Sequence, residues 1–149
     1  MDTLFNSGHG AESLFEDLTA SSGPPEIAIL VLCMHLLQSA ETWDRGGAFG
    51  PVYETAKRAL ALCSCLSEPS VELAQCGALL ALFEFGHGRA KYAYRTLSEA
   101  SANARIIGIT PENHQPRRAS IQHQVKGNHG SIWWGLFILD QSVTPNLPG

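Results

Sequence analysis

Residues 71–88 read VELAQCGALLALFEFGHG, and this stretch decides the fold class. Its first fifteen residues contain only three polar side chains, Glu72, Gln75 and Glu84. An apolar run of this length is typical of a buried helix, and the Gly86-His87-Gly88 turn is expected to end it. We expect Glu84, beside that turn, to be exposed to solvent or to cap the helix.

The segment that follows, residues 89–107, predicts a second helix with one alanine-rich stripe. Small side chains on such a stripe let a neighbouring helix approach to the short end of the usual separation of about 8–10 Å. The basic side chains of Lys91, Arg95 and Arg105 are expected to point away from it. The inner stripe comprises Ala90, Ala93, Tyr94, Leu97, Ala100, Ala104 and Ile107.

Further helices are predicted on both sides of this pair. A short one covers residues 12–19, a second begins at Pro24-Pro25 and runs to about residue 40, and a third begins near Val52. The second is apolar nearly all round, so its His35 is expected to be a core residue bonded to a backbone carbonyl. No segment alternates long enough to predict a strand. The sequence therefore predicts an all-α, irregular multi-helix bundle of about six helices.

The last predicted helix, residues 131–140, carries two adjacent tryptophans, Trp133 and Trp134. Adjacent residues cannot share one helix face, so each indole needs its own apolar contact. We therefore expect this helix to be buried as a plug in the core. With 149 residues, 44% hydrophobic and 16% charged, the chain is long enough for one compact domain. We assign residues 1–22 to a short helix and linker and residues 23–149 to that domain.

In the order of these segments, residues 56–140 resemble the middle homology region, or fungal-specific transcription factor domain, of the fungal zinc-cluster (Zn2Cys6) transcription factors. Three stretches carry the likeness: an apolar helix ending in a glycine turn, an alanine-rich helix bearing an aromatic residue, and a Trp-Trp-x-Leu-Phe-x-Leu-Asp block. The matching residues are Gly86, Gly88, Tyr94, Ala100, Ala104, Gly108, Trp133, Trp134, Leu136, Phe137, Leu139 and Asp140.

The resemblance implies a regulatory domain of a nuclear transcription factor. Its expected partners are other regions or subunits of such a factor, and a small-molecule effector is a further candidate. The chain has four scattered cysteines, whereas a zinc cluster needs six with paired spacing, so direct DNA binding by this chain is not expected. The alternative is a stand-alone helical interaction module, or a truncated competitor of a full-length factor, which places the isolated chain in the cytoplasm as well.

Charge is distributed unevenly: residues 1–88 carry a net −8 and residues 89–149 a net +4. The basic loop with Arg117, Arg118 and Lys126 is a candidate site for an anionic partner. No catalytic motif, metal-ligand spacing or phosphate loop occurs, so we expect neither an enzyme nor a cofactor or metal site. The longest apolar stretch is about half of the roughly 20 residues that a membrane span needs.

Overall fold

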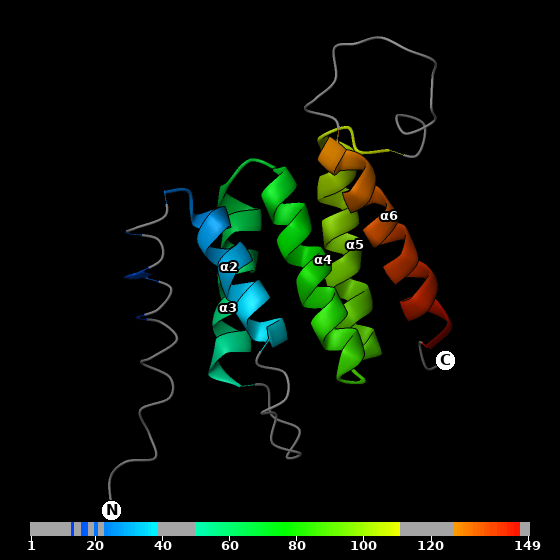
Figure 1. Cartoon of the computed structure of the whole chain (residues 1–149), viewed down its shortest axis with the longest axis horizontal. Coiled ribbons are helices and arrows are strands. Elements are labelled where there is room, and N and C mark those ends of the chain that lie inside the picture. Colours follow the sequence, from blue (N-terminus) through cyan, green and yellow to red (C-terminus); the bar gives the residue numbers. More distant parts are fainter. Residues whose placement is uncertain are drawn as a thin grey trace, which may run out of the picture. The chain divides into compact units, whose positions relative to one another are not determined.

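The computed structural model describes residues 23–38, 50–110 and 127–146, the last range from residue 131 on with side chains, together with Ser13, Glu16, Asp17 and Ala20. In these ranges all regular elements are helical, which confirms the all-α class (Figure 1). Five α-helices are described where about six were predicted, because most of residues 12–19 lies outside the described residues. The elements are α2 (Pro25–Gln38), α3 (Pro51–Leu66), α4 (Val71–Gly86), α5 (Ala90–Ile106), α6 (Gly127–Val143) and the 3-10 helix η3 (Thr144–Asn146).

The chain divides into two compact units, Met1–Ser67 and Glu68–Gly149. The division falls where Ser67, Glu68 and Pro69 interrupt the helices, since proline disfavours a helical conformation in the residue before it. The predicted domain of residues 23–149 includes parts of both units, and it stays a prediction.

In the first unit, α2 and α3 pack against each other. The buried residues of α2 recur at the spacing of one helix face, whereas the opposite face, with Met34 and His35, is exposed. The prediction of a core histidine at position 35 is therefore wrong. The apolar composition of α2 suggested burial all round, but Val31, Met34 and His35 on this helix are exposed. Gly50 and Pro51 begin α3, with proline in the first turn as expected.

The second unit is built on a helical hairpin of α4 and α5, with α6 packed against both (Figure 1). The turn of the hairpin is closed by backbone hydrogen bonds from Arg89 N–H to Glu84 C=O (2.9 Å) and from Gly88 N–H to Phe85 C=O (3.0 Å). Gly88 has φ = 72°, which glycine adopts without the penalty that a side chain brings. The core of the unit consists of Ala74, Ala81, Ala93, Leu97, Ala100, Ala104, Ile109, Ile132, Leu136 and Val143.

The α4 and α5 helices meet at their smallest side chains. A Cβ atom added at Gly77 would lie 2.7 Å from the Cβ of Ala100, closer than real Cβ atoms come. This contact confirms the close approach that the alanine stripe predicted. The hairpin therefore depends on the absence of a side chain at Gly77 and on a single methyl group at Ala100.

Candidate functional site: the groove between α5 and α6

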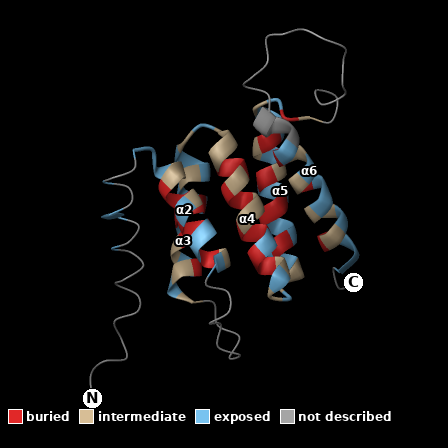
Figure 2. Ribbon diagram, viewed as in Figure 1, coloured by how far each residue is buried: buried red, intermediate tan, exposed pale blue. Residues whose placement is uncertain are grey.

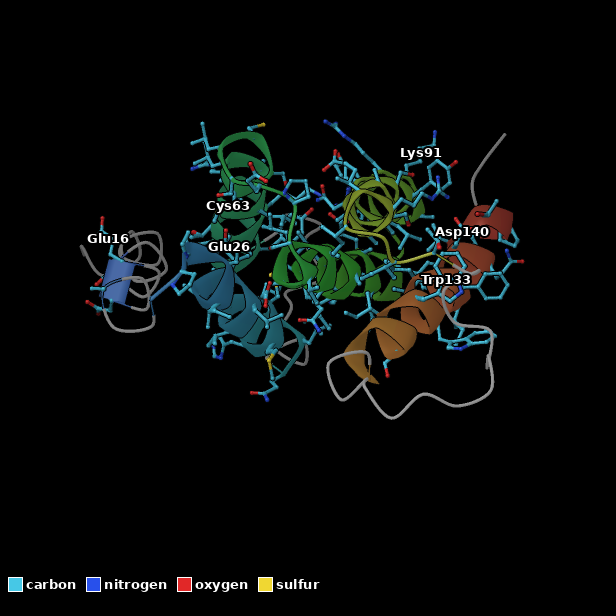
Figure 3. All side chains as sticks on the ribbon, turned by 90° about the horizontal axis from the view of Figure 1, so that it is seen from above. Glu16, Glu26, Cys63, Lys91, Trp133 and Asp140 are labelled. Atoms are coloured by element: carbon cyan, nitrogen blue, oxygen red, sulfur yellow. The ribbon has the colours of Figure 1, made fainter. Side chains whose placement is uncertain are left out.

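A groove of about 280 Å³ lies between α5 and α6. One side is a stripe of α5 residues spaced four, three and four positions apart, so they share one face of the helix. The other side is α6, where Leu136 is 2% exposed and belongs to the core. Figure 3 shows Trp133 and Asp140 on the part of α6 that faces α5. The lining residues are Tyr94, Ser98, Ser101, Arg105, Trp133, Leu136, Phe137 and Asp140.

Three aromatic rings of α6 connect this groove to the outer surface of the helix. The rings of Trp133 and Phe137 have centroids 6.3 Å apart and are nearly parallel. The rings of Trp134 and Phe137 have centroids 5.9 Å apart and meet edge to face. Both arrangements are favourable for aromatic pairs. Trp133 and Phe137 are spaced i, i+4, whereas Trp134 contacts Phe137 at i, i+3.

The two charged residues of the groove lie toward opposite ends of it. The α5 and α6 helices run antiparallel, so Arg105 near the end of α5 is close to the first half of α6 (Figure 1). Asp140 lies two turns further along α6, about 10 Å from the level of Trp133 at the usual helical rise. Within the described residues neither side chain has an ion-pair partner, whereas Arg95 on the same helix pairs with Glu99 at 3.6 Å.

Figure 2 shows exposed segments along α6, and the exposed residues of this helix from residue 131 to 143 are uncharged and largely apolar. Its bulky side chains are exposed: Trp134 by 58%, Phe137 by 43% and Ile138 by 59%. The prediction that this helix is a core plug is therefore wrong for Trp134. Only one side of α6 is packed against α4 and α5 in the described part of the chain, and Trp134 projects from the other side. We define the α6 face as the exposed residues Ser131, Trp134, Phe137, Ile138 and Gln141.

Apart from Trp134, which lies on the outward face of α6, the residues that carried the family resemblance fall into three structural groups. Tyr94, Trp133, Leu136, Phe137 and Asp140 meet in the groove. Tyr94 is 42% exposed there, so its assignment to the inner stripe is wrong: that stripe is narrower than the spacing suggested. Ala100 and Ala104 lie in the core, and Leu139 packs against it. The three glycines stand at helix ends: Gly86 is the last residue of α4, and Gly88 and Gly108 (φ = 82°) follow α4 and α5. Arg117, Arg118 and Lys126 lie outside the described residues.

Sequence reasoning missed a buried polar pair in the hairpin. Glu84 is fully buried, and the Oγ1 hydroxyl of Thr96 donates a 2.6 Å hydrogen bond to its Oε2 atom. The expectation that Glu84 is exposed is therefore wrong. Its place near the end of α4 suggested solvent, but α5 folds back over that end and covers it. The only signal in the sequence was the position of Thr96, one helical turn from Ala93 and from Ala100 of the inner stripe.

A second hollow, of about 460 Å³, lies where η3 meets the first turn of α5. Its lining includes Arg89, Lys91, Tyr92 and Asn146, and the Arg89 guanidinium lies 5.9 Å from the centre of the Tyr92 ring. Two of the residues that line this hollow, Arg89 and Lys91, are basic.

Within the described ranges, no group of three or more His, Cys, Asp and Glu side chains is arranged to hold a metal ion. Across the same part of the chain, no helix combines the length and the apolar character needed to cross a membrane. No protein-family model, curated protein or solved structure matches this chain.

Proposed function

We propose that this chain is a regulatory module of a fungal transcription factor, of the kind the sequence resembles. It controls transcription by packing its helices against other regions or subunits of the factor and by responding to a small-molecule effector. The module acts in the nucleus and itself neither binds DNA nor catalyses a reaction. The observation that carries the proposal is the uncharged α6 face beside the groove between α5 and α6.

The α6 face has the composition of a protein contact surface. The centres of protein interfaces are depleted in charged residues and enriched in aromatic ones. In the α6 face, Trp134, Phe137 and Ile138 are exposed, and the polar residues at its two ends, Ser131 and Gln141, are uncharged. Large exposed apolar patches are uncommon on monomeric proteins, and where they occur they usually mark interaction sites. The face therefore supports regulation through packing.

A stand-alone interaction module, or a truncated competitor of a full-length factor, is the second candidate function. The α6 face supports it equally, because a contact surface serves a separate polypeptide as well as a linked one. The two candidates differ in whether the chain must be part of the factor that it regulates. A module works when linked, and a competitor works when supplied separately.

A reporter assay tests the proposal. The chain is inserted between a DNA-binding segment and an activation segment, and reporter output is compared with that of a flexible linker of equal length. We expect the chain to change the output, and the Trp134→Gln, Ile138→Gln double variant to return it to the linker level. Leu82→Gln is the matched control, since Leu82 is 43% exposed on α4 outside the α6 face.

Equal outputs from the chain and the linker, at equal protein levels, would contradict the proposal. Supplying the chain as a separate polypeptide discriminates the second candidate. A competitor lowers the output of the full-length factor in this arrangement, and the effect is lost with the double variant. A linked regulatory module leaves that output unchanged.

A further inference from the structure

We propose that the groove between α5 and α6 binds an elongated aromatic molecule with an anionic group at one end and a cationic group at the other. The inference rests on the proposed function in one respect: the bound molecule is the effector to which the module responds. The binding itself is argued from the groove alone, from its two separated charges and from the aromatic surface between them.

Arg105 defines the anionic end of the ligand. Its side chain is exposed at the end of the groove nearest the first half of α6, and no acidic side chain of the described residues pairs with it. A guanidinium offers a planar fork of N–H donors that matches a carboxylate in two parallel hydrogen bonds. Trp133 belongs to the same lining, so the carboxylate is expected to be attached to an aromatic ring.

Asp140 defines the cationic end. It is the only charged residue of α6 between residues 131 and 143, it is half-buried in the groove, and no basic side chain of the described residues pairs with it. The face of α6 away from the groove carries no charge at all in this range. A carboxylate at this position recognises an ammonium group, because a charged donor forms the strongest hydrogen bonds with it.

The distance between the two ends sets the length of the ligand. On α6, the lining residues Trp133 and Asp140 are seven positions apart, about 10 Å along the helix axis. The floor between them is Leu136, and the walls are the rings of Tyr94 and Phe137. The volume of about 280 Å³ accommodates two linked six-membered rings but not a folded peptide segment. An α-amino acid, whose charges lie on one carbon, cannot reach both ends.

The experiment uses three synthetic probes of matched shape. The first, 4'-(aminomethyl)biphenyl-4-carboxylate, carries both charges; the second, biphenyl-4-carboxylate, and the third, 4-(aminomethyl)biphenyl, carry one each. Binding to the full chain is measured by isothermal titration calorimetry. We expect saturable binding with one site per chain and the lowest Kd for the probe with both charges.

Charge-neutralising variants assign each end. Arg105→Gln should raise the Kd of the two carboxylate probes about tenfold and leave the amine probe unchanged. Asp140→Asn should raise the Kd of the two amine probes by a similar factor and leave the carboxylate probe unchanged. Arg95→Gln is the matched control on α5: its charge lies outside the groove lining and pairs with Glu99, so no Kd should change by more than about twofold.

Absence of saturable binding by all three probes would overturn the inference, as would an equal effect of Arg105→Gln and Arg95→Gln on the carboxylate probes. Thermal unfolding of each variant shows that the chain is folded in the titration. The reporter assay separates this inference from the proposed function. Binding with the expected variant pattern but no reporter effect supports the groove site and contradicts the regulatory function. A reporter effect that depends on the α6 face, without probe binding, does the reverse.

Discussion

Thr96 on α5 donates a 2.6 Å hydrogen bond to Oε2 of Glu84 on α4, and both residues are buried at the closed end of the hairpin. The Thr96 hydroxyl also lies 2.9 Å from the backbone carbonyl of Tyr92. A hydroxyl has one hydrogen, and Thr96 donates it to the nearer acceptor, the Glu84 carboxylate. The bond links α4 to α5 near the closed end of the hairpin, so it favours one alignment of the two helices along their length.

Replacing Thr96 with valine should destabilise the second unit by about 2 kcal/mol, because a buried acceptor loses a hydrogen-bond donor while the shape of the side chain is kept. Chemical denaturation, followed by circular dichroism, measures the change in the free energy of unfolding. Ser98→Ala is the control on the same helix. Its hydroxyl bonds the Tyr94 carbonyl in an exposed position, so we expect a change below about 0.5 kcal/mol. Equal effects of the two substitutions would show that the buried bond contributes nothing specific.

Gly77→Ala should destabilise the hairpin by about 1–3 kcal/mol, although alanine favours a helix more than glycine does. The new methyl group would lie 2.7 Å from the Cβ of Ala100. Adding Ala100→Gly removes that Cβ and leaves the Ala100 Cα, at 3.4 Å, as the nearest atom. We therefore expect the double variant to be more stable than Gly77→Ala alone, and unfolding midpoints of the four proteins measure this coupling.

Gly135→Ala provides the opposite expectation in α6. An added Cβ at Gly135 meets nothing within 4 Å, so only the backbone effect remains. We expect this variant to be stabilised by about 0.5–1 kcal/mol. If Gly135→Ala lowers the free energy of unfolding, close packing is not what determines the effect of a glycine-to-alanine substitution in these helices.

The sequence predicted the class of the fold because its apolar residues recur at helical spacing and some of its glycines stand at helix ends. Gly88 and Gly108, with positive φ, end the two helices where the sequence placed the ends. The alanine stripe of α5 was also identified correctly at Ala93, Ala100 and Ala104, which all lie in the core. These features are local, so the sequence of a single helix is sufficient to recognise them.

The sequence did not predict which side of each helix is covered. Met34 and Trp134 are apolar and were expected inside, yet they are 50% and 58% exposed, whereas Glu84 is charged and is fully buried. Hydrophobicity alone does not reveal whether a neighbouring helix is present on a given side, and among the described helices α6 has such neighbours on one side only. For the same reason the groove was not predicted: Arg105 and Asp140 lie 35 positions apart in the sequence, and only the packing of α5 and α6 brings them to one site.

Alanine substitutions in α6 distinguish its two sides. Leu136→Ala should cost about 2–5 kcal/mol, because Leu136 is 2% exposed and its removal leaves a cavity in the core. Trp134→Ala should cost only about 1 kcal/mol, which corresponds to the loss of its edge-to-face contact with Phe137. Thermal unfolding of both proteins gives the order. A larger loss for Trp134 than for Leu136 would mean that the indole is buried in solution, by a second chain or by a part of this one, and would reverse our description of the α6 face.

Cys63 on α3 provides a pH-dependent prediction for the first unit. Burial raises the pKa of its thiol, and the nearby negative charge of Glu26 raises the pKa further. Both effects disfavour the thiolate, which is the reactive form, so alkylation of Cys63 should be slow at pH 8 and accelerate as the pH rises through the raised pKa. Glu26→Gln removes one of the two causes, lowers the pKa and should increase the rate at pH 8 roughly two- to threefold.

Mass spectrometry after timed exposure to iodoacetamide measures the rate at each cysteine. Glu54→Gln is the matched control, since Glu54 is an exposed residue of α3 that pairs with Arg58 at 3.6 Å, and it should leave the rate at Cys63 unchanged. Equal rates in the wild-type and Glu26→Gln proteins would show that burial alone, without Glu26, sets the reactivity of this thiol.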